Sequence, residues 1–209
     1  MALSAAMSRI AAGYRSFRDH RWPAERERYL ALAASGQRPE TLVIACSDSR
    51  SDPATIFDAK PGELFVVRNV AAIVPPLELD GSHHGTNAAI AFAVLVLGVR
   101  NILVMGHADC GGVAAALNPQ VGHDVPYLRS WVDLLHPAVE CLGPDLGVRD
   151  RHAALEREAV KLSMERLRGY PFIAERVAQG TLEINGARFG IGDGTLEFLD
   201  VASNAFVEV

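Results

Sequence analysis

The sequence predicts an α/β fold: a mainly parallel central β-sheet flanked by helices, with antiparallel strands at an edge and an N-terminal helical arm. Short apolar runs alternate with helical patterns along most of the chain, which is typical of a parallel sheet. Strand runs separated by turn residues follow near the C-terminus, and an amphipathic stripe opens the sequence. We expect one domain over residues 1–209, with the arm over about residues 1–36.

The expected helices follow from apolar spacing and from residues that start or stop helices. The first carries an apolar stripe at helical intervals, formed by Leu3, Met7, Ile10, Tyr14 and Phe17. A second begins after Pro23 and ends near Gly36. Residues 87–97 are apolar on nearly all sides and predict a buried helix ended by Gly98, and residues 153–168 predict a long, charged amphipathic helix.

The expected strands are short apolar runs bounded by turn residues. Three of them, at Leu42–Ala45, Leu64–Val67 and Ile102–Met105, read as buried strands. The C-terminal part predicts strands at residues 182–184, 188–191 and 196–201. Asn185-Gly186 and Asp193-Gly194 lie between these runs and are expected to form hairpin turns.

Composition and charge narrow the class of protein. Apolar residues make up 49% of the chain, and the net charge of −5 argues against a nucleic-acid partner. The longest apolar run, residues 88–97, is about half the length needed to cross a bilayer, and no signal peptide is recognised. We therefore expect a cytoplasmic protein without a membrane partner, in which cysteines serve as metal ligands or nucleophiles rather than as disulfides.

Reactive side chains follow two of the predicted strands. Cys46 ends the apolar run of "VIACSDSRSD" (residues 43–52), while His107 and Cys110 follow the run of "ILVMGHADCGG". Alone, Cys46 would read as a small buried apolar residue and His107 as a structural histidine. Because the carboxyl ends of parallel strands meet at one sheet edge, the three together predict a zinc site with an open fourth position.

The remaining cysteine and histidines lack ligand spacing, and two charged residues lie beside the predicted metal site. The residues without ligand spacing are Cys141, His20, His83, His84, His123, His136 and His152. Asp48 could accept a proton or become a fourth ligand, and Arg50 can hold this carboxylate through paired hydrogen bonds. Gly111-Gly112 predicts the start of a helix whose backbone N–H groups face the site.

These motifs resemble those of the β-class carbonic anhydrases. The resemblance rests on "CSDSR" at 46–50, "PGELFVVRNVA" at 61–71 and "GHADCGG" at 106–112, and it covers most of the chain from Gly36 to about Leu117. It implies one Zn²⁺ per chain, bound by Cys46, His107 and Cys110. It also implies reversible hydration of carbon dioxide to bicarbonate and a proton through zinc-bound hydroxide, which zinc generates near neutral pH.

The same resemblance assigns roles to further residues. Asp48 and Arg50 match the catalytic pair of the family, and Gln37 matches its substrate-orienting glutamine. The apolar substrate pocket would be lined by Phe65, Val70 and Phe92. The chain departs from the family in three places: tyrosine is expected at Phe92, valine is common at Ser51, and asparagine is common at Ala72.

Quaternary structure and regulation are likewise implied by the family. Its members are built on dimers, so a homodimer or a dimer of dimers is expected, with the N-terminal helix laid across the partner. Some members have an inhibitory bicarbonate site made by a tryptophan, a glycine and an arginine. Here Val43 and Ala45 replace the first two, and Arg68 matches the third. We therefore expect the non-allosteric branch, with an open zinc site rather than one closed by Asp48.

Three other functions fit parts of the pattern. A related zinc hydratase or hydrolase could act on carbon disulfide or carbonyl sulfide with the same ligands. A non-catalytic structural zinc domain would use Asp48 as its fourth ligand, although Gln37 and the Asp48–Arg50 pair argue against it. A thiol redox protein could use Cys46 and Cys110, but His107 favours metal.

Overall fold

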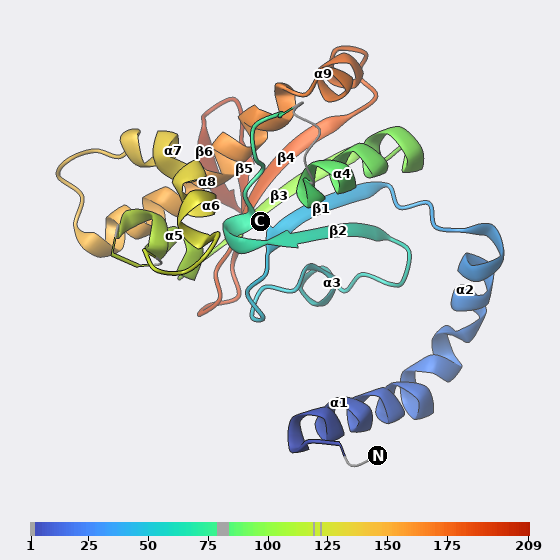
Figure 1. The fold of residues 1–209 in the computed structure, drawn as a ribbon. Helices are drawn as coiled ribbons and strands as arrows, with labels where there is room; N and C mark the ends of the chain where they lie inside the picture. Colours follow the sequence, from blue (N-terminus) through green and yellow to red (C-terminus); the bar gives the residue numbers. More distant parts are fainter. Residues whose placement is uncertain (1–2, 79–83, 119, 122) are drawn as a thin grey trace. The chain divides into compact units, whose positions relative to one another are not determined.

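The computed structural model describes residues 3–78, 84–118, 120–121 and 123–209 (Figure 1). The chain separates into two compact units, residues 1–37 and Arg38–Val209. The expectation of a single domain over the whole chain stays a prediction.

The N-terminal unit consists of helices, as predicted. Helix α1 (Ala5–Ser16) is capped by Ser4 and runs through a π-helical turn, η1 (Phe17–Arg21), into α2 (Trp22–Ser35). Gly36 ends α2 with a φ of 77°, a conformation that glycine adopts without strain. No residue of α1 or α2 is buried. Within the unit the apolar stripe stays exposed apart from Phe17, whose ring packs against Trp22 and Tyr29.

The second unit is built on a six-stranded sheet in the order β2-β1-β3-β4-β5-β6. Its strands are β1 (Thr41–Cys46), β2 (Leu64–Asn69), β3 (Asn101–His107), β4 (Glu183–Phe189), β5 (Leu196–Asp200) and β6 (Ala205–Glu208). Strands β2, β1, β3 and β4 pair in parallel. Strands β5 and β6 extend the sheet at one edge through antiparallel pairing. This confirms the predicted fold class.

One predicted turn is wrong. Asn185-Gly186 lies inside β4, which pairs with β3 without interruption from Glu183 to Phe189. A Cβ on Gly186 would come within 2.6 Å of Met164 Sδ and 2.7 Å of Val160 Cγ1, both on helix α8 (Val148–Arg168). The glycine therefore allows close helix packing rather than a reversal. The predicted turn at Asp193-Gly194 is confirmed between β4 and β5, and β6 was not anticipated.

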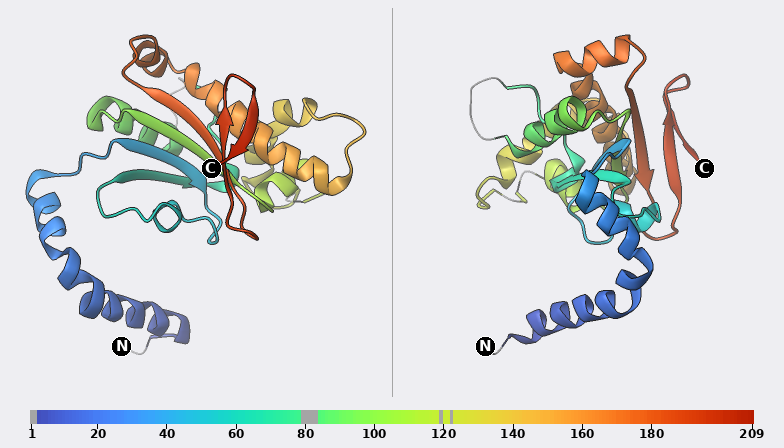
Figure 2. Two further views of the ribbon diagram at one scale, coloured as in Figure 1. Left: turned by 180° about the vertical axis from the view of Figure 1, so that it is seen from behind. Right: turned by 90° about the vertical axis from the view of Figure 1, so that its right-hand side faces the viewer.

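Both faces of the sheet are buried, as parallel strands require. One face packs beneath α8, α9 (Pro171–Ala178), α4 (Gly85–Ala91) and the π-helical η3 (Phe92–Leu97). Figures 1 and 2 show α8 running alongside β3 and β4. The predicted helix over residues 87–97 is thus present as α4 and η3, and Gly98 ends it with a φ of 69°.

Short helices surround the carboxyl ends of β1 and β3. They are η2 (Val70–Ala72), α5 (Gly111–Leu117), α6 (Leu128–Val132), η4 (Asp133–Leu135) and α7 (His136–Glu140), with α3 (Pro53–Ile56) packing on the opposite face. The predicted helix start at Gly111 is confirmed. Within the described residues, no helix has the length and apolar character that crossing a membrane would need.

Candidate metal centre

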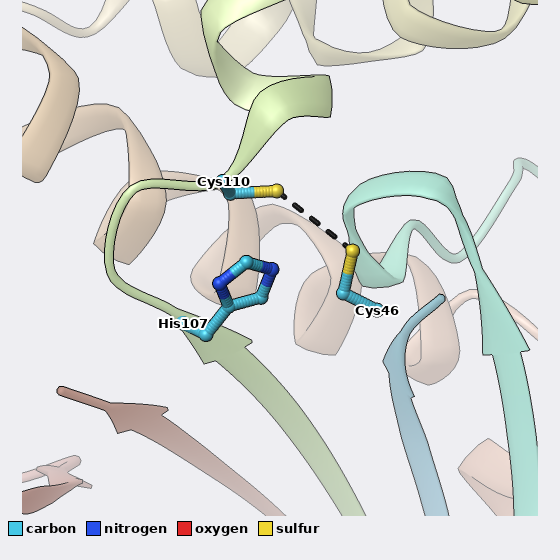
Figure 3. Close-up of side chains that lie close together, drawn as sticks. All are labelled: Cys46, His107 and Cys110. Atoms are coloured by element: carbon cyan, nitrogen blue, oxygen red, sulfur yellow. Dashed lines mark hydrogen bonds between the residues drawn. The ribbon is translucent and has the colours of Figure 1, made fainter. Parts of the chain in front are cut away.

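Three predicted ligands converge at the carboxyl edge of the sheet (Figure 3). Cys46 is the last residue of β1, His107 is the last residue of β3, and Cys110 precedes the first turn of α5. Their donor atoms all lie within 4.8 Å of one another, and the two sulfurs are 3.9 Å apart. The three residues are between 1% and 6% exposed, so the sheet delivers a compact, buried set of soft donors.

The two sulfurs differ in their electrostatic surroundings. The hydrogen bond from the Cys110 thiol lowers the pKa of Cys46, although burial opposes the shift. The same interaction raises the pKa of Cys110. The two thiols thus differ in how readily they lose a proton, and a bound divalent cation would favour the deprotonated form of both.

His107 is oriented as metal-ligating histidines are. Its Nδ1 lies 2.8 Å from the carbonyl oxygen of Ala108, and because a carbonyl only accepts, Nδ1 donates. In the neutral ring this leaves Nε2 as the nitrogen without a proton, which is the form that binds metal. Nε2 is buried and has no hydrogen-bond partner among the described residues. A buried imidazole nitrogen without a partner is costly, and a metal ion would satisfy it.

Asp48 is held by Arg50 rather than joined to the three donors. Arg50 Nε donates to Oδ1 at 3.0 Å and Nη2 donates to Oδ2 at 2.8 Å, while the Arg50 backbone N–H adds a bond of 2.9 Å to Oδ1. These bonds hold the pKa of Asp48 well below its usual range. Asp48 Oδ2 lies 4.0 Å from His107 Nε2, so the carboxylate stands beside the donor set.

Arg68 organises the backbone of the first ligand loop. Its Nε donates to the Cys46 carbonyl at 2.8 Å, and its Nη2 donates to the Asp48 carbonyl at 2.5 Å. Its Nη1 pairs with Asp52 at 3.2 Å. Sequence reasoning matched Arg68 to a regulatory arginine; the structure places it as a support for the residues on either side of Ser47.

A strained turn lies beside Cys46, and sequence reasoning missed the residue that holds it. Ala71 and Ala72 have left-handed φ angles of 64° and 53°. Asn69 spans the turn, because its Oδ1 accepts from Ile73 N–H at 2.8 Å and its Nδ2 donates to the Ile73 carbonyl at 2.9 Å. A backbone hydrogen bond from Ala71 lowers the pKa of Cys46, so the turn serves the donor set.

The predicted substrate residues fall into separate places. The rings of Phe65 and Phe92 pack together with centroids 5.9 Å apart, and Phe92 is 43% exposed. Val70 instead lies against α5, where a Cβ on Gly112 would come within 2.6 Å of Val70 Cγ1. Gln37 belongs to the N-terminal unit.

Among the residues set aside in the sequence, one touches the centre. His152 Nε2 lies 3.2 Å from the carbonyl oxygen of Cys110, although His152 is not itself among the clustered donors. Cys141 is free and exposed, unlike the buried Cys46 and Cys110, and it is not among the clustered donors. His83 lies outside the described residues.

Two sulfurs and one imidazole nitrogen, brought together by a parallel sheet, define the class of zinc centre that leaves a coordination position open. Comparison with known proteins agrees. A family model for carbonic anhydrase matches residues 41–196. The chain is 34% identical over 202 residues to beta carbonic anhydrase 3 of Arabidopsis thaliana, which covers 94% of this chain and 78% of the relative.

Two solved structures extend the agreement. The β-carbonic anhydrase CcaA superposes with a TM-score of 0.92 at 29% identity, over 98% of this chain and all of that one. A tetrameric β-carbonic anhydrase from Sordaria macrospora gives a TM-score of 0.80 at 29% identity, over 94% and 98% of the two chains. The chain belongs to the carbonic anhydrase family, in its β class.

Proposed function

We propose that the chain catalyses the reversible hydration of carbon dioxide to bicarbonate and a proton, with one zinc ion held by Cys46, His107 and Cys110. The observation that carries this proposal is the buried cluster of three soft donors with the unpartnered His107 Nε2. When bound, zinc lowers the pKa of water and supplies a nucleophile near neutral pH. Family membership supports carbon dioxide as the substrate.

Asp48 and Arg50 orient the reacting water in this proposal. Both oxygens of Asp48 are engaged by Arg50, so the carboxylate has one fixed position beside the donor set. From there its Oδ2 can accept a hydrogen bond from water at the open position. Since the carboxylate stays ionised to low pH, it serves as an acceptor across the physiological range.

The substrate pocket is assigned to two copies of the chain. In the sheet, Phe65 pairs with Leu42, four residues before the pairing of Cys46 with Asn69. A strand rises about 3.3 Å per residue, so Phe65 lies ~13 Å from the metal end of its own strand. We therefore assign Val70 to the pocket of its own chain, and Phe65, Phe92 and Gln37 to the pocket of a second copy.

The β2 edge supports a homodimer. In the described part of the chain, β2 pairs with β1 alone and ends the sheet. Exposed apolar side chains lie on β2 and on the adjacent η3; they are Val66, Phe92, Leu95 and Val96. An unpaired edge beside exposed apolar residues is typical of a protein interface. These features support a homodimer or a dimer of dimers, and static light scattering at micromolar concentration tests it.

The open, non-allosteric state is favoured over a site closed by Asp48. Val43 and Ala45 are fully buried and offer no side-chain donor to an anion. Arg68, the remaining match to the regulatory site, is engaged by the Cys46 and Asp48 carbonyls and by Asp52. The Arg50 bonds hold Asp48 beside the donor set, which also supports an open site over a structural zinc site with Asp48 as its fourth ligand.

Stopped-flow measurement of carbon dioxide hydration on metal-quantified protein tests the function. We expect activity in proportion to zinc content, loss with a chelator and return with added zinc. Parallel assays with carbon disulfide and carbonyl sulfide distinguish a carbonic anhydrase from the related hydratase that acts on those substrates. If zinc-loaded protein hydrates none of these substrates, the non-catalytic structural zinc domain becomes the favoured function. A cytoplasmic location stays a prediction, which the free state of the three cysteines supports.

A further inference from the structure

The carbonyl of Cys110 receives a contact that the proposed reaction does not use. His152, near the start of α8, places Nε2 3.2 Å from this oxygen, and because a carbonyl only accepts, the ring donates. The same oxygen accepts the first hydrogen bond of α5, from Ala114 N–H at 3.0 Å. Helix α8 is thus joined directly to a residue that carries a proposed zinc ligand.

The His152 ring is held from its other side by buried charge. Its Nδ1 lies 2.9 Å from Glu156 Oε1, and the Glu156 side chain is 1% exposed. Arg188 on β4 donates to the second oxygen of Glu156 at 2.8 Å and pairs with Glu197 on β5 at 3.1 Å. This chain of contacts ties the orientation of the imidazole to the sheet.

The close approach of α8 to the sheet makes these contacts possible. Gly106 precedes His107 on β3, and a Cβ there would lie 2.8 Å from Val160 Cγ2. Glu156 also lines a cavity of about 10 Å³ that Cys46, His107 and Cys110 share. On the other side it lines a cavity of about 720 Å³, together with Asp109, Arg149, His152 and Arg188. Glu156 therefore lies between the metal centre and this outer cavity, which His152 also lines.

The loop between the ligands needs such support. Asp109 has a left-handed φ of 55°, which is unfavourable for a residue with a side chain. Ala108 N–H is bound by the Phe189 carbonyl at 2.8 Å, and the Asp109 carbonyl accepts from Arg50 at 3.3 Å. His152 provides the third anchor, at Cys110. The three consecutive residues are thus held by three different segments: β4, the loop after β1, and α8.

We infer that His152 is a positioning residue for the metal centre: its imidazole, oriented by Glu156, fixes the Cys110 loop so that the sulfur keeps its place beside Cys46 and His107. The inference rests on the proposed zinc ligands. Groups that orient a ligand from outside the coordination sphere typically change metal affinity by 10–100-fold when removed.

The test compares two substitutions of similar size. His152→Leu keeps bulk but removes the donor, and His152→Gln keeps an amide donor. His136→Leu, at an exposed histidine that starts α7, is the matched control. We would measure the rate of zinc release to a chelator and the absorption bands of the cobalt-substituted proteins. His152→Leu is expected to release zinc roughly tenfold faster or more and to shift the cobalt bands. His152→Gln should stay near the wild type and the control.

The outcomes distinguish a residue that positions the metal ligand from one that contributes only to the stability of the fold. Wild-type release and an unchanged cobalt spectrum in His152→Leu would overturn the inference, even if urea unfolding of the metal-free variant shows lower stability. Equal effects of His152→Leu and His152→Gln would also overturn it, because the donor would then not matter. If wild-type protein binds no zinc, the proposed function fails instead, and zinc analysis of that protein distinguishes the two failures.

Discussion

Replacing Asn69 by alanine should loosen the turn beside the metal centre. The change removes the acceptor of Ile73 N–H and the donor to the Ile73 carbonyl. Asn69 is half-buried, but Ile73, whose polar groups lose their partners, is fully buried. A buried polar group left without its partner costs about 1–3 kcal/mol. The left-handed Ala71 and Ala72 also lose the contacts that offset their strain. We expect the free energy of unfolding to fall by about 2–4 kcal/mol.

Urea denaturation of the metal-free protein measures this loss, and two variants sharpen it. Asn69→Asp keeps an acceptor for Ile73 N–H but sets a carboxylate oxygen against the Ile73 carbonyl, so a clear loss of stability is expected here too. Asn118→Ala removes an exposed side-chain bond to Gln120 N–H and should change stability by no more than about 0.5 kcal/mol. A loss below about 0.5 kcal/mol for Asn69→Ala, or wild-type stability of Asn69→Asp, would refute the reasoning.

Three further predictions concern the donor set and its charged neighbours. Cys110→Ser should lose most of its zinc and be less stable than the zinc-loaded wild type; full zinc retention by elemental analysis would contradict the ligand assignment. Arg50→Ala should reduce carbon dioxide hydration far more than zinc content, because Arg50 orients Asp48 without binding metal; wild-type turnover across the pH profile would contradict it. Because the pKa of Asp48 is lower in the folded than in the unfolded state, its ionised form stabilises the fold at any pH above the unfolded-state pKa of about 3.9. This stabilisation is lost as the pH falls toward the folded-state pKa. The difference in stability between wild type and Asp48→Asn should therefore be constant above about pH 5 and shrink in more acid solution; a difference that grows there would contradict the sign.

The sequence was enough to predict the sheet and the donor set because both depend on local signals. Apolar runs mark β1 and β3, and reactive side chains end each run. The turn predicted at Asn185-Gly186 failed because a glycine that admits a helix looks in sequence like a glycine that reverses the chain. The short β6 has too few residues for a clear alternation.

The supporting residues were harder to predict, since their partners are backbone atoms brought near only by the fold. Asn69 reaches Ile73 within one turn, but its value depends on the left-handed alanines between them. His152 reaches Cys110 across 42 positions of the sequence. No ligand motif marks such residues, because their side chains bind backbone carbonyl or N–H groups and do not bind the metal.

This division of roles has a consequence for the metal-free protein. Arg68, Asn69 and His152 hold the backbone around the donor set through bonds that involve no metal. The donor atoms are already within 4.8 Å of one another, so binding needs little further ordering of the chain. Unlike a zinc finger, whose fold depends on the ion, the chelator-treated protein should keep its fold. Circular dichroism should show unchanged helix content, with a lower unfolding midpoint that returns when zinc is added. Loss of the helical signal on chelation would mean that zinc, and not these three side chains, holds the ligand loops in place.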